Sequence, residues 1–184
     1  LIPKKWPEIV TITTSYGHGM SASPLHLAAA YAAIANGGIY IKPTLIKQSG
    51  PATGRRVLSE KVAADARIML RRVVTNGTAS YGEVKGYEVA GKTGTADKPK
   101  KSGGYYKDKV INTFASMYPA SNPKYVLIVT LDEPVNTMGP RPRRTAGWTA
   151  VPVAAEIIRR TSPLLGLRPQ VEVPVQTTLT AASN

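Results

Sequence analysis

The sequence of 184 residues contains no cysteine. Neither a disulfide framework nor a thiolate metal site is therefore possible, and the absence is compatible with an oxidising compartment. No run approaches the roughly 18 consecutive apolar residues needed to cross a bilayer. The opening residues, Leu1 to Trp6, do not have the form of a signal peptide. This observation carries no information if the protein begins upstream. The length and the hydrophobic fraction of 42% are ordinary for one globular domain.

Acidic residues are also scarce, because 11 Asp and Glu stand against 24 Lys and Arg and leave a net charge of +13. A charge of that size attracts polyanions, so a basic nucleic-acid-binding module is one functional hypothesis. The basic residues, however, occur as scattered pairs without interleaved aromatics, and the chain has a single Phe. The composition favours a solvated basic surface, suited to anionic lipid or cell-wall polymer, and we expect no nucleic-acid partner.

Two further kinds of site are suggested by short patterns and rejected on their context. Gly17–Ala22 has the G-x-G-x-x-A spacing of a dinucleotide site, which needs an acidic residue about 20 positions later. The first acidic residue after this pattern is Glu60. His18 and His26 are possible metal ligands, but no third ligand stands near them in the sequence. We therefore expect neither a metal ion nor an organic cofactor.

Three helices are predicted, over about 23–36, 59–75 and 150–160, because apolar residues recur there at helical spacing. Ser23 and Ser59 precede the first two and have the side chain of a helix cap. The apolar face of the second helix is expected to pack against a sheet. It consists of Val62, Ala66, Met69, Leu70 and Val73.

Three strands are predicted over about 87–95, 110–118 and 125–132. The last contains four consecutive apolar residues, so we expect it to be central in the sheet and buried on both faces. Residues 97–108 are rich in lysine and glycine, and are interpreted either as a flexible flap or as a solvated hairpin loop.

The segment Gly86–Thr93 matches G-x-x-x-x-G-K-[ST], the phosphate-binding loop of nucleotide hydrolases. A helix must begin directly after that loop, but Gly94 and Pro99 stand at the start of the required helix. Glu88 would also place a negative charge beside the phosphates. The context therefore argues against nucleotide binding.

The alternative interpretation places the same residues at the end of an edge strand beside a cleft. Lys92 supplies a positive charge, Thr93 and Thr95 supply hydroxyls, and Gly94 lets a substrate approach the backbone. These groups suit a ligand with a carboxylate, because an ammonium about 4 Å away contributes roughly 4 kcal/mol at an effective dielectric near 20. A backbone N–H at the strand end suits the oxyanion of acyl transfer.

K-T-G is also a signature of penicillin-binding proteins and serine β-lactamases. In its longer form, Val89–Ala96, the motif resembles the transpeptidase domain of class B penicillin-binding proteins. The flanking segments that agree with the family are Ser15–Gly19, Ser23–Leu27, Ala35–Gly38 and Pro119–Tyr125. The resemblance covers roughly residues 9–169 and is closest to the division-specific (septal) members.

This resemblance implies the penicillin-binding transpeptidase/serine β-lactamase-like fold, of class α/β (α+β), with an antiparallel sheet flanked by helices. It also implies a serine D,D-transpeptidase that cross-links peptidoglycan during septal cell-wall synthesis. By this resemblance, an upstream serine would attack the D-Ala-D-Ala carbonyl of a stem peptide, release D-alanine and pass the acyl group to an amine on a neighbouring stem. β-Lactam antibiotics would acylate the same serine.

The family's roles fall on four residues of this sequence. Lys92 would position the substrate and keep the serine and the general base in the right charge state. The hydroxyls of Thr93 and Thr95 would hold the terminal carboxylate, and the Thr95 N–H would be an oxyanion donor. Gly94 would permit close approach of the substrate. The resemblance further implies a place at the periplasmic face of the bacterial inner membrane, with an anchor on an earlier part of the protein and divisome membrane proteins as partners.

The sequence contains no S-x-N and no S-x-x-K on a predicted helix. Ser121–Lys124 spells S-x-x-K, but its Asn-Pro centre marks a turn, whereas the nucleophile and its lysine must lie one helical turn apart. In the family both motifs precede K-T-G. Residues 1–169 are therefore expected to be the C-terminal part of a transpeptidase domain, inactive without the N-terminal half, and 170–184 a tail. A catalytically inactive penicillin-binding sensor domain is the alternative, and a β-lactamase is less favoured.

Overall fold

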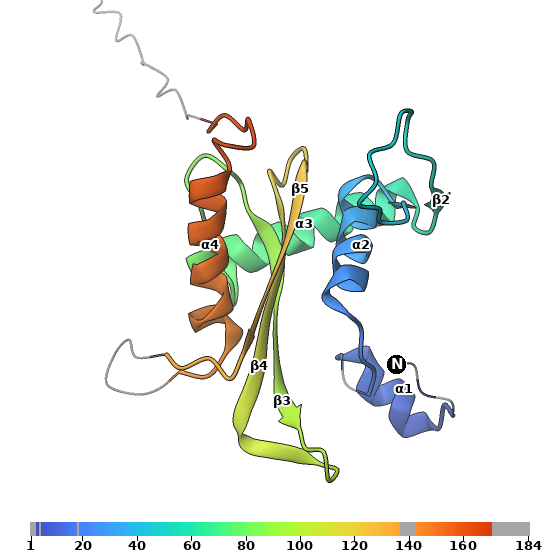
Figure 1. Cartoon of the computed structure of the whole chain (residues 1–184), viewed down its shortest axis with the longest axis vertical. Helices are drawn as coiled ribbons and strands as arrows, with labels where there is room; N and C mark the ends of the chain where they lie inside the picture. Colours follow the sequence, from blue (N-terminus) through green and yellow to red (C-terminus); the bar gives the residue numbers. More distant parts are fainter. Residues whose placement is uncertain (1–2, 4, 18, 137–142, 171–184) are drawn as a thin grey trace, which may run out of the picture.

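In the computed structural model of the chain, the residues described are 3, 5–17, 19–136 and 143–170. A three-stranded antiparallel sheet stands between helices that cover its two faces (Figure 1). Its strands are β3 (Ala90–Pro99), β4 (Tyr105–Tyr118) and β5 (Tyr125–Asp132), in the spatial order β3-β4-β5. This arrangement confirms the predicted fold class of an antiparallel sheet flanked by helices.

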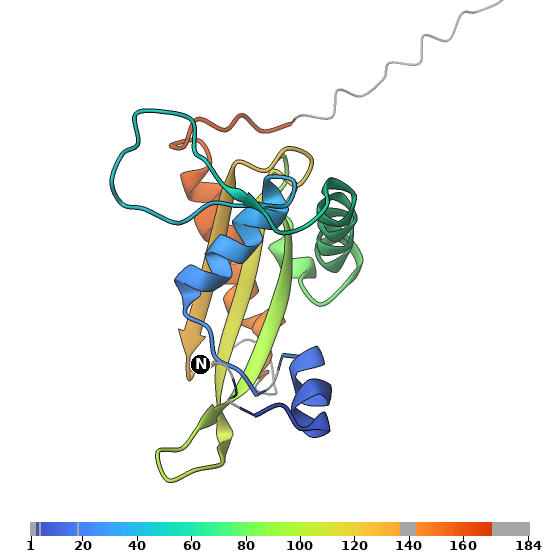
Figure 2. The ribbon, with the colours of Figure 1, turned by 90° about the vertical axis from the view of Figure 1, so that its right-hand side faces the viewer.

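The longer helices are α2 (Pro24–Ala35), α3 (Glu60–Asn76) and α4 (Ala150–Thr161), each within one residue of its predicted bounds. Helices α2 and α4 pack on opposite faces of β4 and β5, whereas α3 runs beside the β3 edge (Figures 1 and 2). Both predicted caps are present. Ser23 Oγ accepts the His26 N–H at 3.3 Å, and Ser59 Oγ accepts the Val62 N–H at 3.2 Å.

The remaining elements are short. They are α1 (Glu8–Ser15), β1 (Ile39–Tyr40), β2 (Arg55–Arg56) and two 3₁₀ turns, η1 (Ser80–Gly82) and η2 (Ala146–Trp148). Strands β1 and β2 form a separate antiparallel pair. In the described part of the chain, no helix combines the length and apolar character that crossing a membrane requires.

Strand β3 begins at Ala90, so the prediction that it starts at residue 87 is wrong. Glu88 has a φ of 42°, which is not extended backbone. Its carbonyl accepts the Ala120 N–H at 2.7 Å and its carboxylate accepts the Ser121 N–H at 3.2 Å. These contacts hold residue 88 in a turn against the β4–β5 connection, and ladder pairing starts only where Ala90 meets Met117.

Strands β3 and β4 extend further than predicted and form a hairpin that projects beyond the helices (Figure 2). Of the two interpretations of residues 97–108, the structure has the hairpin, closed by the Lys100 N–H donating to Gly104 O at 2.9 Å. Near its stem, Glu133 pairs with Lys109 at 2.8 Å and with Lys98 at 2.7 Å. These hydrogen bonds, first that of Lys109, hold the pKa of Glu133 below its ordinary value.

The central strand is β4, so the prediction that residues 125–132 are central is wrong for the described sheet. Strand β5 pairs with β4 along one edge, and no described strand pairs with its other edge. Of its apolar run, Val129 is buried and the three preceding residues are half-buried. Helices α2 and α4 cover the two faces of β5, but in the described sheet only β4 pairs with it.

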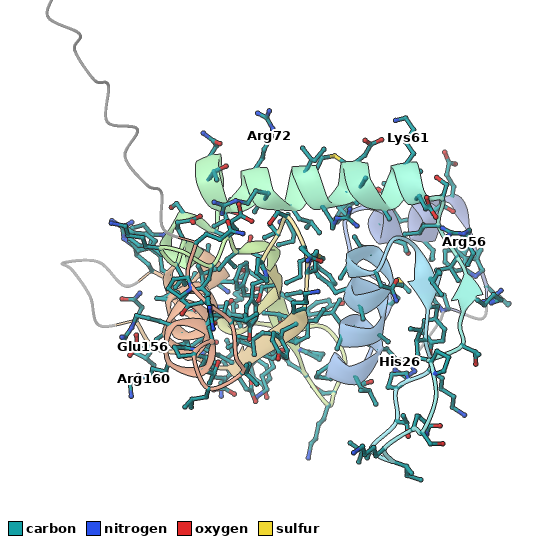
Figure 3. The ribbon with its side chains drawn as sticks, turned by 90° about the horizontal axis from the view of Figure 1, so that it is seen from above. His26, Arg56, Lys61, Arg72, Glu156 and Arg160 are labelled. Carbon is teal, nitrogen blue, oxygen red and sulfur yellow. The ribbon has the colours of Figure 1, made fainter. Side chains whose placement is uncertain are left out.

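Helix α3 is rotated relative to the predicted orientation. Val62 and Met69, which were expected to face the sheet, are 50% and 61% exposed, whereas Ala63 and Val74 are buried. The other three residues of the predicted face, Ala66, Leu70 and Val73, are half-buried. Lys61 and Arg72 point away from the rest of the molecule (Figure 3). The apolar pattern alone therefore misplaced the buried stripe.

Two arginines on α3 explain the rotation, because they turn inward and donate to backbone carbonyls. Arg67 Nη1 donates to Ile34 O of α2 at 3.4 Å, and Arg71 Nη1 donates to Val89 O at 2.8 Å. Arg71 also pairs with Glu83 through both terminal nitrogens. Such charge-assisted hydrogen bonds satisfy the guanidinium groups and fix α3 against the start of β3.

The hydrophobic core lies mainly between the sheet, α4 and the turns η1 and η2. Its buried members are Val74, Ala79, Val84, Tyr87, Val89, Phe114, Tyr118, Val129, Ala146, Ala150, Val151, Ala154 and Ile158. Because η2 and the first turn of α4 belong to this core, the segment that precedes α4 is held directly against the sheet.

Candidate active site

The predicted site residues lie on β3, which is an edge strand as expected. Thr93 pairs with Phe114 of β4, and Thr95 pairs with Asn112. Since side chains alternate along a strand, Thr93 and Thr95 share one face, while Lys92 and Gly94 share the other.

A cleft of about 370 Å³ opens beside the two threonines. One wall is β3, a second is the end of α3 with η1, and a third is η2 with the residue before it. The lining residues are Gly77, Thr78, Ser80, Tyr81, Thr93, Thr95, Thr145, Ala146, Gly147 and Trp148. The predicted groove beside the K-T-G strand is therefore present, and it is bounded by segments far apart in the sequence.

Both threonine hydroxyls are held by neighbours from these walls. Thr93 Oγ1 and Thr78 Oγ1 are 2.8 Å apart, so that one hydroxyl donates to the other. Thr95 Oγ1 accepts the Ala146 N–H at 3.0 Å. The cleft thus presents two fixed hydroxyls on one strand face, a geometry that suits the two oxygens of a carboxylate.

Lys92 occupies a different position from the one the sequence suggested for it. Its ammonium donates to the Thr93 carbonyl at 2.8 Å and approaches Thr93 Oγ1 at 3.4 Å. The side chain is exposed and does not line the cleft of the two threonines. The side chain of Lys92 leaves the strand on the face opposite the two threonines, and its positive charge lies within reach of the Thr93 hydroxyl.

The two glycines of the motif have different surroundings. A Cβ at Gly91 would lie 2.5 Å from Ala115 O and 2.7 Å from the Phe114 ring, so packing requires glycine there. A Cβ at Gly94 would meet nothing closer than Thr113 O at 3.9 Å. Open space beside Gly94 agrees with the predicted close approach of a ligand to the backbone.

An aromatic wall that the sequence did not reveal lines the cleft at η1 and η2. The rings of Tyr81 and Trp148 are 4.8 Å apart at 50°, and the Arg143 guanidinium lies 3.6 Å from the centre of the Trp148 ring. Asn136 Nδ2 donates to Trp148 O at 2.7 Å. No local pattern connects these residues, since only the packing of η1 against η2 brings them together.

The patterns rejected at the sequence level have other roles in the structure. The Ser121 hydroxyl donates to the Glu88 carboxylate in the turn after β4 and does not begin a helix. Residues after Thr93 continue β3, whereas a phosphate-binding loop requires a helix there. His18 lies outside the described residues, and His26 Nδ1 is 2.7 Å from Ser23 Oγ. Among the residues that the structure describes, no three His, Asp or Glu side chains gather as a metal site would require.

Comparison with known families agrees with the fold. The model of the penicillin binding protein transpeptidase domain matches residues 1–159. The chain belongs to this family.

Relatives with similar sequences are named as transpeptidases or as a sporulation protein. The chain is 36% identical over 184 residues to the probable peptidoglycan D,D-transpeptidase FtsI of Caulobacter vibrioides, covering 94% of this chain and 31% of the relative. It is 34% identical over 170 residues to stage V sporulation protein D of Bacillus subtilis, covering 86% and 25%. The chain thus spans less than a third of the length of these relatives.

Solved structures give the same result for the fold. The transpeptidase domain of penicillin-binding protein 3 from Burkholderia pseudomallei superposes with a TM-score of 0.81 at 38% identity, covering 94% of this chain and 51% of that one. Penicillin-binding protein 3 of Mycobacterium tuberculosis, in complex with aztreonam, gives a TM-score of 0.79 at 30% identity, covering 93% and 42%.

Proposed function

We propose that this chain is the K-T-G-bearing part of a septal peptidoglycan D,D-transpeptidase, and that the complete protein is a target of β-lactams. The observation that carries the proposal is the pair of fixed hydroxyls, Thr93 and Thr95, facing a cleft on the edge strand. Membership of the transpeptidase family supports the same conclusion.

The residues of β3 would bind and orient the acyl donor. The hydroxyls of Thr93 and Thr95 would hold the terminal carboxylate of the stem peptide, and open space at Gly94 would let the peptide lie along the strand. The Thr95 N–H would stabilise the oxyanion, for which one donor is worth on the order of a hundredfold in rate.

Lys92 would act through its ammonium, which lies beside Thr93. Its ammonium contacts the Thr93 carbonyl and hydroxyl oxygens, and this places a positive charge within a few ångströms of the proposed carboxylate site. It would thereby favour the anionic substrate and keep the nucleophilic serine and its base in the reactive charge state.

The nucleophilic serine and its lysine would come from the N-terminal half of the same protein. The sequence offers one S-x-x-K at Ser121–Lys124, and the structure uses this serine in a turn. The missing half would cover the cleft and supply the attacking group, so the isolated chain would be inactive. The complete enzyme would work at the periplasmic face of the inner membrane, beside divisome membrane proteins.

β-Lactam binding would use the same groups, since these inhibitors carry an anionic group, a carboxylate or a sulfonate, beside a reactive carbonyl. The related penicillin-binding protein 3 of M. tuberculosis has been solved with aztreonam. A catalytically inactive sensor domain would keep the same β3 residues, and would differ in the missing half.

The test is labelling of the complete protein with fluorescent penicillin. Wild-type protein should be labelled, and Lys92→Ala should be labelled at least tenfold more slowly. Lys61→Ala is the matched control, because Lys61 lies on the outer surface of α3 and points away from the sheet (Figure 3). An unlabelled wild type would refute the proposal, and equal rates for Lys92→Ala and wild type would refute the role of Lys92.

A further inference from the structure

Asn112 is a buried amide behind the cleft. It is 0% exposed and lies on β4 directly opposite Thr95. Residues opposite each other in an antiparallel pair project to the same face of the sheet. The side chains of Asn112 and Thr95 therefore project from the same face of the sheet.

The amide of Asn112 holds both ends of the segment that forms the third wall of the cleft. Its Nδ2 donates to Arg144 O at 2.9 Å and to Thr149 Oγ1 at 2.7 Å. Because a backbone carbonyl only accepts, the atom that contacts Arg144 must be the nitrogen. Thr149 Oγ1 in turn donates to Thr145 O at 3.3 Å, which closes the segment on itself.

This segment also determines the direction of the Thr95 hydroxyl. The Ala146 N–H donates to Thr95 Oγ1 at 3.0 Å and so occupies one of its acceptor positions. The hydroxyl proton is then available to a ligand in the cleft. A hydroxyl that must donate selects an acceptor, such as a carboxylate oxygen.

Burial of the Asn112 side chain in the core is energetically unfavourable. Its Oδ1 is buried and has no hydrogen-bond partner among the described residues. An unsatisfied buried oxygen lowers stability, so its presence calls for a compensating function. The two donations that fix residues 144–149 supply that function.

We propose that Asn112 is a positioning residue for recognition of the substrate carboxylate. It holds the wall segment so that the Ala146 N–H meets Thr95 and leaves the Thr95 proton for the ligand. This inference rests on the proposed function, because it assumes that the Thr95 hydroxyl binds the carboxylate of a donor peptide or β-lactam.

The experiment compares acylation of the complete protein by a penicillin and by the methyl ester of the same penicillin. Asn112→Leu has similar volume and lacks both donations. We expect it to lower the acylation rate with the free carboxylate about tenfold, as loss of one hydrogen bond to a charged group predicts. The rate with the ester should change less than twofold, since the ester carries no charge at this site.

Ser116→Ala is the matched control. Ser116 is equally buried on β4, but its hydroxyl donates to Leu127 O, away from the cleft. It should lose a similar amount of thermal stability and keep the wild-type ratio of the two rates. If Asn112→Leu does not fold, Thr149→Val removes an acceptor of the same amide and should lower the same ratio.

The inference is overturned if Asn112→Leu slows both ligands equally, because that outcome indicates only a general loss of structure. A ratio equal to that of wild type overturns it as well. In a Thr95→Val background, Asn112→Leu should have no further effect on the ratio, and additive effects would contradict the proposal. Absence of any acylation in the wild type would instead refute the proposed function.

Discussion

On the face of the sheet covered by α4, the chain packs a dense core, whereas the face covered by α2 is only partly closed. Helix α4 buries Ala150, Val151, Ala154 and Ile158 against β4 and β5. Helix α2 buries only Ala29 and Ala33, and α1 buries none of its residues. Large apolar side chains such as Leu25, 63% exposed, remain at the surface on the α2 side.

The comparison shows that the chain forms a complete hydrophobic core on the α4 face of the sheet and leaves the α2 face partly uncovered. The cleft walls η1 and η2 belong to the α4 side, where the packing is continuous. The α2 side and the outer edge of β5 present apolar surface and an edge without a described strand partner, features that favour a covering segment. This agrees with the proposal that the N-terminal half of the transpeptidase domain completes the fold.

The largest expected effect concerns the chain on its own. Because the α2 side is open, the isolated chain should be insoluble or molten and should lack a cooperative thermal transition in near-ultraviolet circular dichroism. The same residues within the complete protein should melt cooperatively. A reversible, cooperative melt of the isolated chain would contradict the contrast between the two faces.

The next prediction tests the packed side. Phe114 is 0% exposed within the core, so Phe114→Ala should lower the free energy of unfolding by about 3–5 kcal/mol. The control is Met69→Ala on the outer surface of α3, which should change it by less than about 0.5 kcal/mol. Urea unfolding of the complete protein measures both. Similar costs for the two variants would show that the assigned burial is wrong.

A smaller effect is expected at the cap of α3. Ser59→Ala removes the hydrogen bond from the Val62 N–H and should cost about 1 kcal/mol. Ser59→Asp keeps an acceptor at the cap and adds a favourable charge at the helix N-terminus, so it should cost little. If urea unfolding gives equal losses for the two variants, the cap is not the cause.

The smallest effect concerns Tyr31 on α2 and the pH dependence of stability. Partial burial of the half-buried Tyr31 ring raises its pKa to about 12. The neutral phenol is therefore favoured in the folded state. Between pH 10 and about 12 the unfolded chain binds fewer protons at this residue than the folded chain does. The free energy of unfolding should consequently fall as the pH rises through this range. Phenolate absorbance of the complete protein should contain one step near the upper value that Tyr31→Phe removes. If Tyr31→Phe leaves the phenolate absorbance in that pH range unchanged, the ring of Tyr31 is not shielded in the fold.

The helices were predictable because their signals are local. Ser23 and Ser59 each stand directly before an apolar-periodic segment, and both cap the helix that follows. The orientation of α3 was not predictable, since it depends on Arg67 and Arg71 reaching carbonyls of other elements. Hydrophobic periodicity treats arginine as a solvent residue and cannot register such a contact.

The candidate site divides in the same way. The edge position of β3 and the residues from Lys92 to Thr95 follow from the motif and its extended neighbours. The contact of the Lys92 ammonium with the Thr93 carbonyl, and the aromatic wall of Tyr81 and Trp148, do not. Both depend on side-chain directions that appear only when the strand is paired and the 3₁₀ turns are packed.

The sequence by itself determined the three longer helices, the K-T-G strand and the family, because caps, periodicity and a contiguous motif are properties of neighbouring residues. It did not indicate the short helix α1. Tertiary structure alone decided how the cleft is built. The hydrogen bond from the Ala146 N–H to Thr95 joins residues 51 positions apart, and the donation from Asn112 to Thr149 spans 37. Contacts at such separation depend on strand register and on the packing of α4, which no local propensity encodes.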